Sequence, residues 1–222
     1  GVWEPAGKRT ARCLFTDSRG RVWGTVRGGR FYRYDPKAGR RERLDLHLPW
    51  PDYAEGVDPT AEKIARNRLM RAAVFDPKIG SHYVLGRCTE LLSRLDVETE
   101  TITPLADLGR WGGRRGRYPR PSTLAFVRRG RQIFYVPWGR GRYTDLVSYH
   151  IDTGRLTHHS PIRADGRRVV ELHSLAVGSD GKLHGVAFVY AAPDSPAAKL
   201  GRRMGGRPYD MRFIVIDPPP GR

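Results

Sequence analysis

The chain alternates short apolar segments with polar turns along most of its length. Four segments share one layout, in which an apolar strand runs into a polar turn with Gly and a second apolar strand follows; they begin at Arg12, Arg71, Ser122 and His173. Each is followed by a strand that ends in an Asp-containing turn, and in the first three copies by a fourth strand. Asp caps such turns through the backbone and Gly takes their positive-φ positions. The pattern therefore predicts four-stranded antiparallel units that repeat every 50 to 65 residues or so.

The turn motifs of the repeat carry a resemblance to a known superfamily. They are Gly-Arg-Val-Trp-Gly at 20–24, Tyr-Asp-Pro-Lys-Ala-Gly at 34–39 and Ser-Asp-Gly-Lys-Leu-His-Gly at 179–185. This pattern resembles the β-propeller superfamily that includes streptogramin-lyase-like and gluconolactonase-like proteins and the oligogalacturonate and ulvan lyases. The resemblance covers nearly the whole chain and implies an all-β propeller with four blades, but the motifs identify blades and not an activity.

The expected blades span about 10–48, 69–107, 121–162 and 168–217, within a single propeller domain or fragment over 1–222. In the first blade we expect strands near 11–17, 21–26, 30–35 and 41–48. We expect helix only in insertions, chiefly Thr60 to Arg68, because Asp58-Pro59-Thr60 is a helix start pattern. Trp23, Tyr83 and Phe134 share one position on the second strand and are expected to be buried.

The fourth copy stops where its last strand would begin, and residues 1–9 are a poor substitute for that strand. Two hypotheses follow. Either the four blades belong to a larger ring of six to eight, which we favour, or they close as a four-bladed ring with an imperfect seam.

Long insertions occupy 49–68, 109–121, 139–143 and 191–210, and in an antiparallel blade all of these links leave from the same face. Functional residues concentrate on long loops held by a rigid scaffold. Arg forks bind carboxylate, sulfate or phosphate, and aromatic rings stack on sugars. The substrate-binding candidates are Arg115, Arg140, Arg142, Trp111 and Tyr209 from the insertions, together with Arg12 and Arg71 from the inner strands. A solvated Arg surface with aromatics that pin the loops is the competing structural interpretation.

The inner strand of each blade starts at this face, so its first residue is expected to line the central channel. That position holds Arg12, Arg71, Ser122 and His173, with Glu171 two residues before His173. We expect His173, Arg71 and Arg12 to converge at the channel mouth. A lone histidine is more often structural than catalytic, so both roles stay open for His173.

The formal charge of +17 favours an anionic partner, although Arg outnumbers Lys by 34 to 6, as GC-rich coding alone can produce. The expected partner is an acidic polysaccharide or another anionic ligand. Nucleic acid ranks lower because no Lys/Arg run follows a continuous groove.

No apolar run is long enough to span a membrane. The sequence leaves the compartment open, and the hypothesis we retain is a secreted or periplasmic location. Cys13 and Cys88 lack CxxC spacing and are expected to be small hydrophobes.

The resemblance implies a function hypothesis, a polysaccharide lyase that acts on a uronate-containing glycan by β-elimination. His173 would be the base, Tyr118, Tyr143 or Tyr209 the acid, and an Arg would neutralise the uronate carboxylate. No cofactor is predicted, since a divalent metal of the oligogalacturonate-lyase type would need ligands from further blades. The alternative is a non-catalytic propeller that binds an anionic glycan or a protein. A lactonase-like hydrolase would need a carboxylate and Asn ligand set that we do not find in the sequence.

Overall fold

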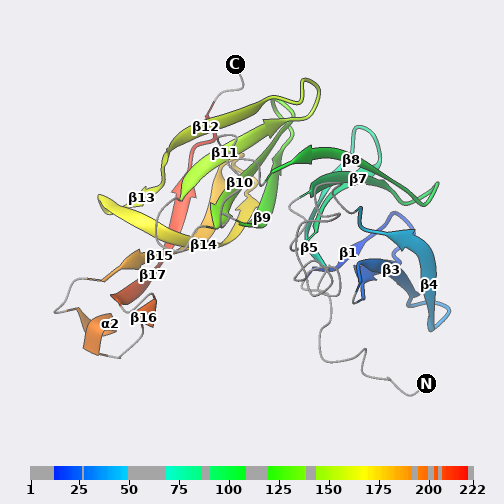
Figure 1. The fold of residues 1–222 in the computed structure, drawn as a ribbon, viewed down its shortest axis with the longest axis horizontal. Coiled ribbons are helices and arrows are strands. Elements are labelled where there is room, and N and C mark those ends of the chain that lie inside the picture. Colours follow the sequence, from blue (N-terminus) through cyan, green and yellow to red (C-terminus); the bar gives the residue numbers. More distant parts are fainter. Residues whose placement is uncertain are drawn as a thin grey trace, which may run out of the picture. The chain divides into compact units, whose positions relative to one another are not determined.

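The computed structural model describes residues 13–26, 28–49, 69–86, 91–108, 120–138, 144–191, 195–199, 203–204 and 207–219, and nearly all of them are in strands or turns (Figure 1). The chain divides into two compact units, Gly1–Leu108 and Gly109–Arg222. Each unit contains two antiparallel sheets. The expected helix at Thr60 to Arg68 and the residue Cys88 lie outside the described residues.

The first unit holds two four-stranded sheets whose strands are neighbours in chain order. Sheet 1 consists of β1 (Phe15–Thr16), β2 (Val22–Thr25), β3 (Arg30–Asp35) and β4 (Arg40–His47). Sheet 2 consists of β5 (Met70–Asp76), β6 (Ser81–Gly86), β7 (Leu91–Asp96) and β8 (Thr101–Asp107).

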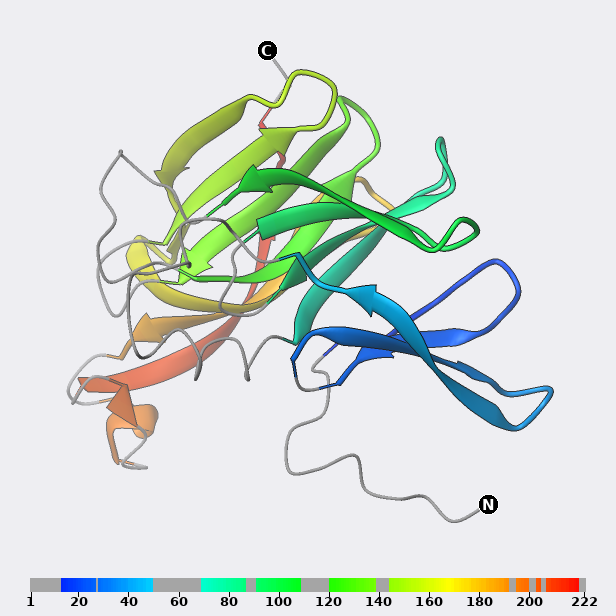
Figure 2. The ribbon, with the colours of Figure 1, turned by 45° about the vertical axis from the view of Figure 1, so that its right-hand side comes forward.

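The second unit repeats this arrangement and adds two short strands. Sheet 3 consists of β9 (Arg120–Val127), β10 (Gln132–Trp138), β11 (Asp145–His150) and β12 (Leu156–Pro161). Sheet 4 consists of β13 (Arg163–Ala164), β14 (Arg167–Val177), β15 (Leu183–Tyr190), β17 (Arg207–Ile216) and β16 (Arg203–Met204), in that spatial order. One helical turn, α2 (Pro196–Lys199), lies in the 191–210 insertion, where helix was expected. Figures 1 and 2 show sheet 3 against β14 and β15 within this unit.

The strand register confirms the repeat. In all four sheets the residue three positions after the first residue of the repeat pairs with the equivalent residue of the next strand: Phe15 with Trp23, Val74 with Tyr83, Ala125 with Phe134, and Ala176 with His184. The four-bladed, all-β prediction is therefore confirmed at the level of residue pairing.

Each unit has an apolar core between its two sheets. In the first unit Trp23 and Phe31 of sheet 1 join Met70 and Val84 of sheet 2 in one buried cluster, against which Cys13 packs. In the second unit Phe134 of sheet 3 belongs to a cluster that includes strands of sheet 4. Trp23, Tyr83 and Phe134 are 0%, 1% and 0% exposed, as the shared register predicts.

The Asp turns follow the prediction in part. Asp35 Oδ1 accepts the backbone N–H groups of Lys37 and Ala38, and Asp96 Oδ1 accepts those of Glu98 and Thr99. The equivalent Asp152 and Asp217 instead make ion pairs with Arg131 and Lys182.

The first strand is shorter than the expected 11–17. Residues 11 and 12 lie outside the described part, and Asp17 has left the strand. Its Oδ1 accepts the N–H groups of Arg19 and Arg21 at 3.0 and 2.9 Å, which fixes the turn there instead. The other strands of this blade, 22–25, 30–35 and 40–47, match the expected ranges to within one residue.

One face of sheet 4 exposes large apolar side chains. Met211, Phe213 and Val215 alternate along β17 and are 53%, 70% and 50% exposed. Their Cα partners on β15 are Phe188, Val186 and His184. His184 stands at the position that Trp23 and Phe134 occupy in sheets 1 and 3, where the equivalent face is buried.

Candidate functional site

Most of the residues that the sequence singled out for function fall in insertions beyond the described part of the chain. The structure describes Arg71, His173 and Tyr209; those outside the described residues are Arg12, Trp111, Arg115, Tyr118, Arg140, Arg142 and Tyr143. Arg71 is half-buried on β5 in the first unit, whereas His173 and Tyr209 lie in the second. Convergence of Arg12, Arg71 and His173 stays a prediction.

His173 projects from an irregular stretch of β14. The pairing of β14 with β15 shifts between Val169 and Glu171 and again between Leu172 and Ser174, so His173 has no Cα partner on β15. Bulges of this kind re-aim a side chain out of the regular alternation. The His173 side chain is 69% exposed, and its Nδ1 lies 3.8 Å from Glu171 Oε1.

Three rings meet at sheet 4, where His173 is exposed, Tyr209 is half-buried and Phe188 between them is buried. The His173 ring lies 5.5 Å from that of Phe188, and the Phe188 ring meets that of Tyr209 edge-on at 4.9 Å. We call His173, Phe188 and Tyr209 the ring cluster. It joins two residues that the sequence predicted separately, through a third that sequence reasoning missed because Phe188 lies in the apolar run of β15 and reads as core.

Three described arginines of sheet 4 are paired with carboxylates. Arg167 NH1 and Arg212 NH2 each lie 3.5 Å from Asp210, Arg212 Nε lies 3.3 Å from Asp165, and Arg168 lies 3.6 Å from Asp145. Arg163 is exposed and instead donates to the backbone carbonyl of Gly166. The ion pairs reduce the cationic charge that this sheet offers to an acidic ligand.

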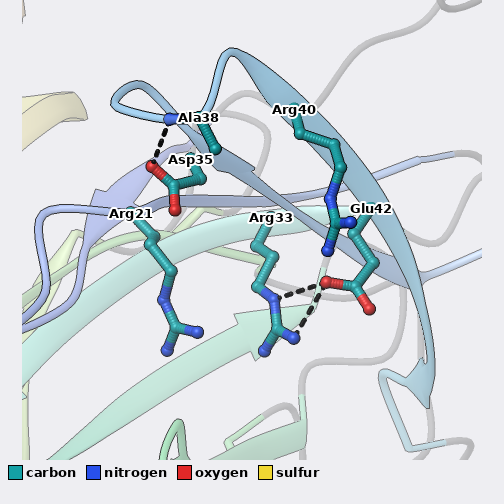
Figure 3. A pocket seen from close by; sticks show the side chains of 6 residues that line it. All are labelled: Arg21, Arg33, Asp35, Ala38, Arg40 and Glu42. Atoms are coloured by element: carbon teal, nitrogen blue, oxygen red, sulfur yellow. Dashed lines mark hydrogen bonds and ion pairs between the residues drawn. The ribbon is translucent and has the colours of Figure 1, made fainter.

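A pocket of about 190 Å³ opens at the turn end of sheet 1, and Figure 3 shows its lining residues: Arg21, Arg33, Asp35, Ala38, Arg40 and Glu42. Arg33 donates to Glu42 through Nε at 2.9 Å and also pairs with Glu100 of the β7–β8 turn. The guanidinium carbons of Arg21 and Arg33 both lie 5.8 Å from the centre of the Trp23 ring. Sequence reasoning missed this pocket, because its arginines belong to turns and strands whose pattern is typical of a solvated surface.

Two of the other histidines, His82 and His159, are held by contacts within the fold. His82 is 4% exposed and its ring lies 4.1 Å from that of Phe15. Ser148 and His159 Nε2 are hydrogen-bonded at 2.9 Å, but Ser148 is 1% exposed and therefore not a nucleophile that a substrate can reach.

Within the described residues no three His, Cys, Asp or Glu side chains form a group that could hold a metal. Nor does the described part contain a helix long and apolar enough to cross a membrane.

No protein-family model and no curated protein matches the sequence. Solved structures of β-propeller-like proteins do match the fold. A gluconolactonase from Xanthomonas campestris aligns over 88% of this chain and 60% of its own, with 13% identity and a TM-score of 0.50. An auxiliary nutrient binding protein from Bacteroides thetaiotaomicron aligns over 96% and 43%, with 10% identity and a TM-score of 0.50.

Hydrazine synthase from Kuenenia stuttgartiensis aligns over 97% of this chain and 53% of its own, with 12% identity and a TM-score of 0.51. The chain spans less than two thirds of each of these three structures, so the larger-ring prediction is consistent with them. The resemblance to gluconolactonase-like propellers is confirmed at the level of fold. Because proteins with such different names share it, the fold by itself does not assign an activity.

Proposed function

We propose that this chain is a carbohydrate-binding propeller that binds an acidic glycan at the ring cluster and the adjoining insertions. The observation that carries the proposal is the contact of three rings, with His173 and Phe188 5.5 Å apart and Phe188 and Tyr209 4.9 Å apart. The buried Phe188 ring supports the exposed His173 and the half-buried Tyr209, which are the rings a ligand can reach. Aromatic rings bury the C–H face of a sugar, and the Tyr hydroxyl and imidazole nitrogens can hydrogen-bond its hydroxyls.

The acidic groups of the glycan would meet arginine forks from the insertions. Arg115, Arg140 and Arg142 stay our candidates, since the guanidinium plane matches a carboxylate in bidentate geometry. The net charge of +17 would also draw a polyanion to the surface, in a way that salt screens. One structural neighbour is named a nutrient binding protein, and this likeness supports a binding role.

The decisive variant is Tyr209→Ala, with Phe213→Ala as its matched control on the same strand and face. Loss of the Tyr209 ring should weaken binding of polygalacturonate about three- to tenfold, the range for one aromatic contact. Phe213 is 70% exposed and lies outside the ring cluster, so its removal should leave the affinity unchanged. The affinities are measured by calorimetry in 0.15 M salt, which screens the non-specific attraction between the basic protein and the polyanion. Equal affinities of the two variants would refute this site.

A second candidate function, β-elimination, is favoured by the position of Glu171. A carboxylate 3.8 Å from His173 Nδ1 can hold the proton there and leave Nε2 free as a base. Nε2 would take the C5 proton of a uronate, the electron pair would form a C4–C5 double bond, and the C4–O bond would break. A tyrosine, Tyr118 or Tyr143 by the sequence prediction, would give its proton to the leaving oxygen.

Ultraviolet absorbance of the unsaturated product separates the two functions. A lyase would raise the absorbance with polygalacturonate, and His173→Ala would abolish turnover while polymer binding persisted. If the unmodified protein binds the polymer without a rise in absorbance, the binding function alone stands.

A further inference from the structure

The pocket at the turn end of sheet 1 contains hydrogen-bond donors that the described residues leave unsatisfied. The Arg21 side chain is only 13% exposed, and its Nε donates to Asp17 Oδ2 at 2.7 Å. Its two terminal nitrogens have no hydrogen-bond acceptor among the described residues. These nitrogens line the pocket and are not among the buried unpaired atoms of the described residues, so they can donate to an acceptor that enters the pocket.

Arg40 is the second available cation. It lies on β4 opposite Asp35 and lines the pocket, yet it forms no ion pair or hydrogen bond with any residue in the described ranges. Arg33, by contrast, is held by both Glu42 and Glu100. Figure 3 shows Arg33 beside Glu42, with Arg21 pointing the same way from the end of the β1–β2 turn. Arg21 and Arg40 are therefore the groups that can receive an anion.

The same pocket presents carboxylate acceptors. Asp35 uses Oδ1 for the turn amides of Lys37 and Ala38, and no described donor is paired with its Oδ2. Glu42 pairs with Arg33 through Oε2, and its Oε1 has no such contact among the described residues. A carboxylate oxygen accepts hydrogen bonds from hydroxyl groups. These carboxylates, with Asp17 and Glu100 behind them, disfavour a dianion such as sulfate.

We propose that this pocket binds a small hydroxy acid, in the class of a single sugar acid. Its carboxylate lies between Arg21 and Arg40, and its hydroxyls donate to Asp35 and Glu42. The volume of about 190 Å³ fits this size class, since it is below the roughly 300–1,000 Å³ of sites for drug-sized ligands. The Trp23 ring, in contact with both Arg21 and Arg33, holds the guanidinium groups in place. The site lies in the first unit and is separate from the ring cluster.

The test is calorimetric titration with sodium glucuronate, in a Tyr209→Ala background so that the ring cluster makes no contribution. Glucuronate should bind. Glucose, which lacks the carboxylate, and sodium sulfate, which lacks the hydroxyl groups, should bind at least about tenfold more weakly. Arg40→Gln should weaken glucuronate about tenfold or more. It should leave the urea unfolding midpoint unchanged, because Arg40 has no partner within the described residues.

Arg41→Gln is the matched control. Arg41 is the next residue of β4 and faces the opposite side of the sheet. Its substitution removes the same charge, so the affinity for glucuronate should stay within about twofold of the parent value. The proposal is overturned if glucuronate gives no heat at millimolar concentration, if Arg41→Gln weakens it as much as Arg40→Gln, or if sulfate binds as tightly. If the pocket does not bind glucuronate, the proposal of polymer binding at the ring cluster still stands. If the ring cluster does not bind polymer, the proposal for the pocket still stands.

Discussion

Trp23 donates its indole N–H to the Asp17 carboxylate at 2.8 Å, and both residues are buried. The same carboxylate accepts the backbone N–H groups of Arg19 and Arg21 and pairs with the Arg21 guanidinium. Burial by itself would raise the pKa of Asp17, but the hydrogen bonds from Trp23 and Arg21 outweigh it and lower that pKa. One side chain thus closes the β1–β2 turn and fixes the largest ring of the sheet 1 core.

Replacing Asp17 by Ala should lower the free energy of unfolding by about 3–5 kcal/mol, because it leaves the Arg21 charge and the Trp23 N–H buried without their partner. Asp152→Ala breaks a pair in which Asp152 is 52% exposed, and should cost less than about 1 kcal/mol. Urea unfolding followed by tryptophan fluorescence measures both. Similar losses for the two variants would show that the Asp17 network is not a structural centre.

His82 should make stability depend on pH. Burial lowers the pKa of His82 to about 4 from 6.5, and its Nδ1 has no partner among the described atoms. Between these values the unfolded chain binds the proton that the folded chain rejects, so stability is complete above pH 6.5 and is lost as the pH falls toward 4. The loss is about 3 kcal/mol at most.

Urea midpoints from pH 7 to pH 4 measure this dependence. Partial desolvation also lowers the pKa values of His158 and His159, so the informative quantity is the difference between the parent and His82→Gln, which cannot titrate. The variant should show a flatter pH profile than the parent. A His82→Gln profile as steep as the parent's would contradict the assignment.

Phe134 should be far more important for stability than its exposed counterpart on β17. Phe134 is 0% exposed in the core between sheets 3 and 4, so Phe134→Ala should cost about 3–5 kcal/mol. Phe213 is 70% exposed, and Phe213→Ala should change stability by about 0.5 kcal/mol or less. Differential scanning calorimetry of the two variants provides the comparison. A large loss for Phe213→Ala would mean that its ring is buried in solution.

The parts of the fold that depend on local pattern could be predicted from the sequence. Alternation placed Trp23, Tyr83 and Phe134 in register, and the Asp turns set where strands end. The contact of His173 with Phe188 could not be predicted, because the register shifts on either side of Leu172 leave no trace in the alternation of polar and apolar residues. The sheet 1 pocket was missed for a related reason, since Arg21 and Arg40 are far apart in sequence and come to line one pocket, on either side of β3, only through pairing of β2, β3 and β4.

The exposed apolar side chains of β17 should govern self-association and contribute little to stability. Replacing Met211, Phe213 and Val215 together by Thr keeps β-propensity, so unfolding should shift by no more than about 1 kcal/mol. Light scattering at high protein concentration should fall. Ile214→Thr, on the buried face of the same strand, should instead destabilise the second unit. If the triple variant scatters as much as the parent, this face does not drive association.

Exposure of that face also sets how the protein should behave as a colloid. Attraction between apolar surfaces strengthens on warming and in kosmotropic salts such as sulfate, whereas repulsion between molecules of charge +17 weakens as salt is added. Both changes act in the same direction. The chain should therefore stay dispersed in cold, dilute buffer, and warming or added sulfate should cloud the solution well below the temperature at which the sheets unfold.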